Sequence, residues 1–286
     1  MKKMKYIISA GLIILLSCAS NPTVRDDVKL ALNDRVSVGN EEFRKGNFNT
    51  AELFFKEALR DAYSIDDIHS QIMILVSLGE VSLAKNDIEK AADRIHLAKE
   101  IAEGSSVKKH DFILNIGIGK LLIRGGNHDS ARNHYYKALK TAGDNKQKAV
   151  AYNNLGIVYS RDESGRYDRA LEYLEKAVRI NSRGPVYNQL ADNYYNLGNV
   201  YFRIEEWKSA MKYYKKALEA DRISENSHGI IKDLRRLAET SLRSGDKENA
   251  LFYYERALRT AEALRLPDYT AELRSEIARI RKEMEN

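Results

Sequence analysis

The chain has 286 residues, with 47 basic and 41 acidic side chains and a formal net charge of +6. Three of the lysines lie within residues 1–17, so the rest of the chain has 44 basic residues against 41 acidic ones. This small surplus, with no basic run interleaved with aromatic residues, argues against nucleic acid as a partner. The only cysteine is Cys18, which excludes a disulfide-stapled fold.

Residues 1–17 are predicted to be a signal peptide. Lys2, Lys3 and Lys5 form a basic head, and an uncharged, mostly apolar run follows from residue 6 to residue 17. A helix of that length would extend about 18 Å, which is too short for a hydrocarbon core of about 30 Å. The layout is therefore that of a secretion signal and not of a membrane span.

The end of this run, Leu15-Leu16-Ser17-Cys18, resembles the processing site of bacterial lipoproteins. The resemblance implies cleavage before Cys18 and attachment of lipid to this cysteine, with residues 18–25 as a lipidated tether. Ala19 resembles a signal for sorting to the outer membrane. A lipid-anchored protein of the bacterial cell envelope, at the outer membrane and facing the periplasm, is therefore expected. An ordinary signal peptide with a chance cysteine is the alternative.

Residues 26–286 contain an internal repeat of about 40 residues. Two columns of alanine recur at this spacing: Ala51, Ala91, Ala131, Ala170, Ala210 and Ala250, and then Ala58, Ala98, Ala138, Ala177, Ala217 and Ala257. Large residues recur between them: Phe55, Ile95, Tyr135, Leu174, Tyr214 and Tyr254. Because the segment is rich in helix-forming residues and poor in proline, the repeat predicts an all-helical solenoid of similar units.

Each unit is predicted to be a helix, a turn and a second helix. Turn signals with glycine or asparagine recur at residues 45–47, 85–87, 125–127, 165–166 and 244–246, and glycine or asparagine tolerates the left-handed conformation that ends a helix. A small residue recurs in each first helix: Gly39, Gly79, Gly119, Gly156, Gly198 and Ala238. We expect this small residue to let the second helix approach closely, while the large residue of that helix fills the gap.

These columns resemble the tetratricopeptide repeat. Residues 154–159 (NLGIVY) and 196–201 (NLGNVY) are similar to its first helix, and residues 167–177 are similar to its second helix. The resemblance implies an all-α, right-handed superhelical solenoid of six helix-turn-helix repeats. The repeats are expected at about 26–65, 66–105, 106–143, 144–183, 185–224 and 225–264. Residues 267–285 are predicted to form a capping helix.

The resemblance also implies that the first helices line a concave groove, which binds extended or helical segments of partner proteins. Positions three before, one after and five after the small column share one helical face. The predicted peptide-binding groove comprises Asn40, Arg44, Arg124, Asn153, Arg161, Tyr195, Asn199, Arg203 and Arg243. Asparagine amides can bond a peptide backbone, and arginine suits acidic side chains. The arginines also fit the preference for cations near helix C-termini, which is the alternative explanation.

The groove is further expected to be apolar in its N-terminal half, on account of Val36, Val76 and Ile116. No catalytic constellation, metal-ligand set or cofactor-binding loop is found in the sequence. We therefore expect a binding scaffold and not an enzyme, with no cofactor, with other envelope proteins as partners and with self-association left open. A small-molecule-binding lipoprotein subunit of a solute-uptake system is the alternative function, and a closed apolar pocket would favour it.

Overall fold

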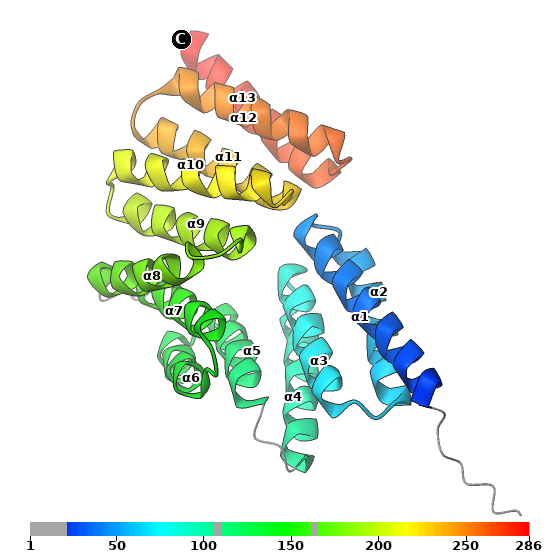
Figure 1. Cartoon of the computed structure of the whole chain (residues 1–286). Helices are drawn as coiled ribbons and strands as arrows, with labels where there is room; N and C mark the ends of the chain where they lie inside the picture. The colour runs from blue at the N-terminus through cyan, green and yellow to red at the C-terminus, as the bar shows by residue number, and fades with distance from the viewer. Residues whose placement is uncertain (1–21, 106–109, 162–164, 286) are drawn as a thin grey trace, which may run out of the picture.

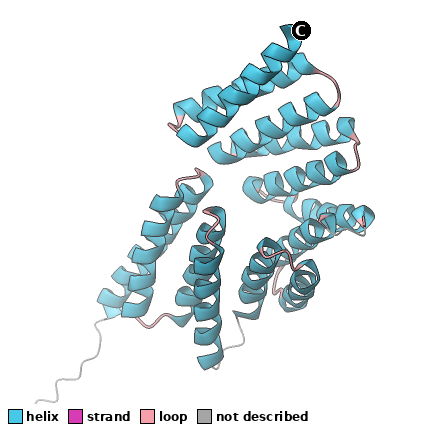
Figure 2. Cartoon of the chain, turned by 180° about the vertical axis from the view of Figure 1, so that it is seen from behind, coloured by secondary structure: helices cyan, strands magenta, loops and turns pink. Residues whose placement is uncertain are grey.

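The computed structural model describes residues 22–105, 110–161 and 165–285, and every regular element within these ranges is an α-helix (Figures 1 and 2). The thirteen described helices are α1 (Pro22–Arg44), α2 (Phe48–Ser64), α3 (Ile68–Ala84), α4 (Ile88–Gly104), α5 (Asp111–Arg124), α6 (His128–Thr141), α7 (Asn145–Ser160), α8 (Tyr167–Asn181), α9 (Tyr187–Arg203), α10 (Trp207–Ile223), α11 (Ser227–Arg243), α12 (Lys247–Ala263) and α13 (Pro267–Glu285). The predicted all-helical fold class is confirmed.

The helices pack as successive pairs, from α1 with α2 to α11 with α12, and α13 packs on α12. The second helices begin at Phe48, Ile88, His128, Tyr167, Trp207 and Lys247, so successive starts are 39 or 40 residues apart. Helix α1 already begins at Pro22, ahead of residue 26, where the solenoid was expected to start. The repeat in the sequence is therefore a repeat of helix pairs.

The small residue of each first helix faces the large residue of its partner helix. A Cβ atom placed on Gly198 would lie 2.5 Å from the ring of Tyr214, and one on Gly39 would lie 2.8 Å from the ring of Phe55. Tyr214 is fully buried and Phe55 nearly so. Because no side chain fits between the glycine and the facing ring, glycine allows the two helices of each of these pairs to approach closely, as the sequence predicted.

The turns within the helix pairs adopt the left-handed conformation at the predicted positions: Gly46, Asn86, Gly126, Gly165 and Gly245. Four non-glycine residues adopt it as well, without a signal in the sequence: Asp66, Glu205, Glu225 and Arg265. Most of these four lie between one pair and the next. At Glu205, Glu225 and Arg265 the turn therefore holds a residue type that does not favour this conformation.

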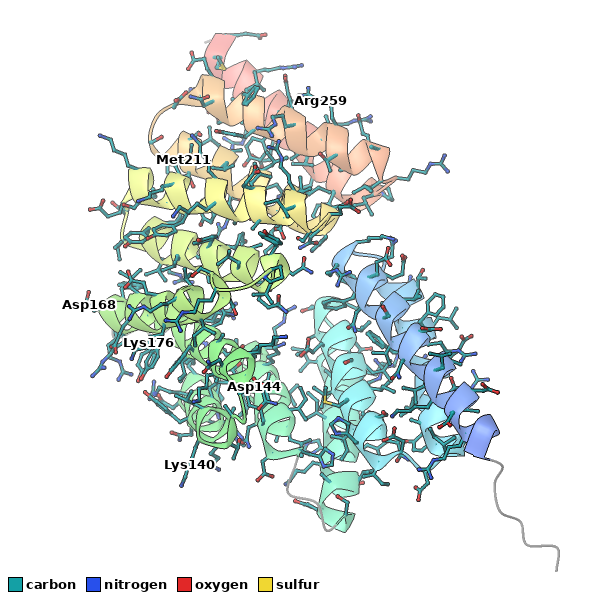
Figure 3. The ribbon with its side chains drawn as sticks, viewed as in Figure 1. Lys140, Asp144, Asp168, Lys176, Met211 and Arg259 are labelled. Carbon is teal, nitrogen blue, oxygen red and sulfur yellow. The ribbon has the colours of Figure 1, made fainter. Side chains whose placement is uncertain are left out.

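The first helices form one continuous layer, since α3 contacts α5, α5 contacts α7, α7 contacts α9 and α9 contacts α11. Figure 1 shows that the array curls until the α1–α2 pair lies beside the α9–α11 region. The rings of Phe48 and His228 meet there, with their centroids 5.8 Å apart. In Figure 3, the labelled Lys140 and Asp168 of second helices lie at the outer edge, away from the enclosed space.

The expectation of an apolar N-terminal half of the groove is wrong. Val76 and Ile116 are 1% and 2% exposed and belong to hydrophobic clusters, and Val36 packs against another such cluster. Their side of the first helix is an interface with neighbouring helices. They contribute to the core that joins successive units and do not line a binding surface.

The predicted signal peptide, residues 1–17, and the predicted lipid-attachment residue Cys18 lie outside the described residues. Within the described part of the chain, no helix is both long enough and apolar enough to span a bilayer.

Candidate functional site on the concave face

Three predicted groove arginines come together on the concave face. Arg124 ends α5, Arg161 directly follows α7 and Arg203 ends α9, and all three are exposed. Desolvation and the positive charges of Arg124 and Arg203 lower the pKa of Arg161, which places the three guanidinium groups within electrostatic range of one another. We call Arg124, Arg161 and Arg203 the arginine patch.

Few groups within the protein bond to the guanidinium groups of the arginine patch. Arg124 donates a hydrogen bond of 2.6 Å to the carbonyl oxygen of Leu83. The side chains of Arg161 and Arg203 form no hydrogen bond or ion pair with any other residue in the described ranges. Each of these guanidinium groups has several N–H donors and no acceptor, so the patch can receive carboxylates or other oxyanions.

The other two predicted arginines lie elsewhere. Arg44 lines a cavity between the α1–α2 turn and helices α9 and α11. Arg243 lines a different cavity, of about 490 Å³, together with Glu272 and Glu276 of α13. Five arginines were predicted at the position five residues after the small column. Three of them therefore lie together in the arginine patch, and the other two, Arg44 and Arg243, lie in separate cavities.

An amide network adjoins this surface. The Oδ1 atom of Asn153 accepts hydrogen bonds from the amides of Asn193 (2.9 Å) and Asn196 (3.0 Å), and the amide of Asn181 donates to Oδ1 of Asn193 (2.7 Å). We call Asn153, Asn181, Asn193 and Asn196 the amide network. It lines a cavity of about 340 Å³ that also exposes Lys120, Asp192 and Lys232. Sequence analysis identified Asn153 alone, although asparagine inside a helix is itself a signal for polar function.

The remaining predicted groove residues differ in what they can offer a partner. Asn40 is exposed on α1. Oδ1 of Asn199 already accepts hydrogen bonds from the Tyr214 hydroxyl (2.9 Å) and from Arg236 (2.8 Å), so its acceptor is used within the fold. The ring of Tyr195 lies 3.9 Å from Nζ of Lys232, a cation–π contact.

A second charged site lies where the curl brings the first helix pair against α9–α11. The cavity there measures about 280 Å³, and its carboxylates are Asp192 of α9, Asp221 of α10 and Asp233 of α11. We call this the acid cavity. Burial raises the pKa of Asp233 to about 9 and that of Asp221 to about 6. The charge of Asp221 further raises the pKa of Asp233, and the charge of Asp192 further raises that of Asp221. Sequence analysis missed these residues because they occupy different registers on three helices.

His228 closes one side of the acid cavity. It is half-buried, between Phe48 of α2 and Tyr269 of α13, and Nδ1 lies 3.3 Å from the Tyr269 hydroxyl oxygen. Burial and the nearby charges of Lys232 and Arg235 lower the pKa of His228 to about 4. The imidazole is therefore neutral at physiological pH. Within the described ranges, no group of three or more histidine, cysteine or acidic residues is arranged to hold a metal ion.

Comparison with known proteins gives the following matches. The family model described as "Tetratricopeptide repeat" matches residues 111–183, 149–223 and 189–263. Outer dynein arm-docking complex subunit 4 of Danio rerio is 26% identical over 205 residues, which cover 67% of this chain and 40% of that protein. Response regulator aspartate phosphatase E of Bacillus subtilis (strain 168) is 27% identical over 199 residues, which cover 64% of this chain and 49% of that protein. The chain thus spans less than half the length of these relatives.

A solved structure of a Rap protein complexed with competence and sporulation factor also matches, with a TM-score of 0.61 and 16% identity. The match covers 90% of this chain and 71% of the Rap chain. At this identity the likeness establishes a shared fold.

Proposed function

The chain belongs to the tetratricopeptide repeat family and has the architecture of a protein-interaction scaffold, and we propose that it binds an extended or helical segment of a partner protein on its concave face. The proposal places this scaffold in the bacterial cell envelope, held at the membrane by lipid on Cys18. The partner segment includes acidic residues, which lie against the arginine patch.

The arginine patch is the single observation on which this proposal depends. Arg161 and Arg203 are exposed and unpaired within the described ranges, and they lie with Arg124 on one surface. Keeping like charges close together costs free energy unless a ligand neutralises them, so such a patch favours an acidic partner. The neighbouring amide network offers both donors and acceptors, which suits the backbone of a bound segment.

The comparisons support a receptor role in general terms. The Rap protein of similar fold was solved with competence and sporulation factor bound. The cavity at the amide network is lined mainly by charged and amide side chains. This lining favours a peptide over an apolar solute, and so favours the scaffold over a subunit of a solute-uptake system.

The membrane anchor rests on the sequence of residues 1–18. Its test is metabolic labelling with radioactive palmitate in cells that express the full-length chain. Label is expected on the wild type and absent from Cys18→Ser. Fractionation of the labelled cells then tests the proposed location at the outer membrane, facing the periplasm. Equal labelling of both chains would contradict the anchor and leave the groove proposal intact.

Partner binding is tested by chemical crosslinking in cells, capture of the full-length protein in detergent and mass spectrometry. The test variant is Arg161→Glu with Arg203→Glu, and the matched control is Lys140→Glu with Arg259→Glu, on the exposed surfaces of α6 and α12. We expect a partner that the wild type and the control retain and that the test variant loses. A partner retained equally by the test variant would contradict a role for the arginine patch.

A further inference from the structure

The acid cavity contains a carboxyl group that the fold leaves incompletely bonded. Asp233 is 1% exposed, and its Oδ2 atom has no hydrogen-bond donor among the described residues. Its neighbour is Asp221, which is 5% exposed. Two buried carboxylates in contact repel each other, so they are compatible only while they share a proton or while a cation lies between them.

Asp221 is the member of this pair that is fixed as the anion. Its Oδ1 atom accepts a hydrogen bond of 2.8 Å from the Asn226 amide, and its carboxylate packs against Gly229 in the first turn of α11. A Cβ atom on Gly229 would clash with that carboxylate. The N-terminus of a helix favours negative charge, so the shared proton resides mainly on Asp233.

A third carboxylate faces the same space. The side chain of Asp192 forms no hydrogen bond or ion pair with another described residue, and it lines both the acid cavity and the cavity of the amide network. The cation inside is Lys232, whose Nζ atom lies over the Tyr195 ring. Arg44 stands at the α1 side, and His228 is neutral. The three carboxyl groups therefore outnumber the one ammonium group that faces them from α11.

We propose that the acid cavity binds an ammonium or guanidinium group, which displaces the proton shared by Asp221 and Asp233 and is held by these two carboxylates and Asp192. The incoming charge equals the charge of the departing proton, which passes to solvent, so the net charge of the site does not change. This inference rests on the proposed function. It adds that the partner segment has a basic residue in the acid cavity while its acidic residues lie on the arginine patch.

The geometry supports such a segment because the two cavities lie next to each other and share Asp192 and Lys232 in their linings. The bound segment would run from the amide network into the space between α9–α11 and the α1–α2 turn. The groups that face the shared proton are then Asp192 from α9, Asp221 from α10, Lys232 and His228 from α11, and Arg44 from α1.

The test is isothermal titration calorimetry on the full-length protein in mild detergent at neutral pH. The probes are n-butylguanidinium, n-butylammonium and the neutral n-butylurea, which has nearly the shape of the first. Each titration is run in phosphate and in HEPES, a bulky zwitterion with no primary ammonium group, and their different ionisation enthalpies reveal proton release. We expect both cations to bind with release of a proton, and n-butylurea to bind at least about tenfold more weakly. Equal binding of n-butylurea would overturn the proposal.

Two variants keep the proposal open to refutation. Asp233→Asn mimics the protonated carboxyl, and Asp192→Asn changes a side chain that forms no hydrogen bond or ion pair with another described residue. Both should fold, as far-ultraviolet circular dichroism would verify, and both should weaken n-butylguanidinium binding at least about tenfold. Asp233→Asn should also abolish proton release. The matched control, Asp93→Asn on the exposed face of α4, should bind as the wild type does. Unchanged binding in both site variants would overturn the inference.

The source of the cation follows from partner capture with the Asp192→Asn, Asp233→Asn double variant. Loss of the partner assigns the cation to the partner segment, whereas a retained partner together with lost n-butylguanidinium binding assigns it to a free amine. If the wild type captures no partner but binds n-butylguanidinium with proton release, the groove function fails and the cation site stands.

Discussion

The arginine patch and the acid cavity both gather like charges on the concave face, but they resolve the repulsion in different ways. Arg124, Arg161 and Arg203 are exposed, so water and salt screen them and all three stay charged. Asp221 and Asp233 are buried, and burial raises the pKa of both. The charge of Asp221 raises the pKa of Asp233 further, so the pair keeps a proton.

This difference shows that like charges can come together in a repeat array in two ways: by sharing one position in successive repeats, or by burial where several helices converge. The arginines share one position in successive first helices, so their approach follows directly from the stacking of units. The carboxylates belong to α9, α10 and α11 and meet only because a second helix and two first helices converge there. Four substitutions test the contrast between a screened surface patch and a buried cavity.

The largest effect is expected from Gly229→Ala. Alanine normally favours a helix, but here its Cβ would clash with the Asp221 carboxylate and force that group away from α11. We expect a loss of about 1–3 kcal/mol in the free energy of unfolding, measured by urea denaturation. Gly104→Ala is the matched control, because a Cβ atom placed there would meet no other part of the fold within 4 Å, and it should be neutral or stabilising. Equal effects of the two changes would contradict the packing described for Asp221.

Asn153→Ala tests the amide network that adjoins both sites. The substitution removes the acceptor of Asn193, which is 2% exposed, and leaves that buried amide without this hydrogen bond. We expect a destabilisation of about 1–2 kcal/mol by the same measurement. Asn40→Ala, on the exposed surface of α1, should change stability by less than about 0.5 kcal/mol. If Asn153→Ala unfolds at the same urea concentration as the wild type, water replaces the lost acceptor.

Asp233→Asn should stabilise the protein at alkaline pH. Burial raises the pKa of Asp233 in the folded state, so the folded protein binds a proton that the unfolded chain releases, and wild-type stability falls as the pH rises from 5 to 9. The asparagine amide replaces that proton, so the variant should lose less stability over this range. We expect a gain on the order of 1 kcal/mol at pH 8, from thermal unfolding curves across pH. A parallel pH dependence in the two proteins would refute the shared proton, and Asp93→Asn serves as the control.

Arg161→Gln should have the smallest effect, because the arginine patch is exposed. Removing one charge relieves repulsion from Arg124 and Arg203, so stability at low salt should rise by no more than about 0.5 kcal/mol. Raising the salt concentration should stabilise the wild type more than the variant. Salt screens the repulsion among the arginines in the wild type, whereas the substitution has already removed part of that repulsion in the variant. A large gain that salt does not diminish would place Arg161 in a buried environment.

The sequence by itself determined the helix pairs and much of the arginine patch. The spacing of Gly198 and Tyr214, and of their counterparts in the other pairs, identified which helices approach closely, because close approach needs a small residue opposite a large one. The same spacing placed Arg124, Arg161 and Arg203 in one register. These features follow from contacts within a unit or between adjacent units, which a repeat encodes at fixed separations.

Only the tertiary structure decided how the array curls and which residues meet across it. Packing between adjacent helix pairs buried Val76 and Ile116, which the sequence had assigned to the groove, and the curl brought Phe48 against His228. It also completed the acid cavity around Asp233 from segments far apart in the chain. Such contacts depend on the small rotation between successive units, summed over the array. No single repeat specifies that sum, so the sequence pattern could not reveal where the two ends would meet.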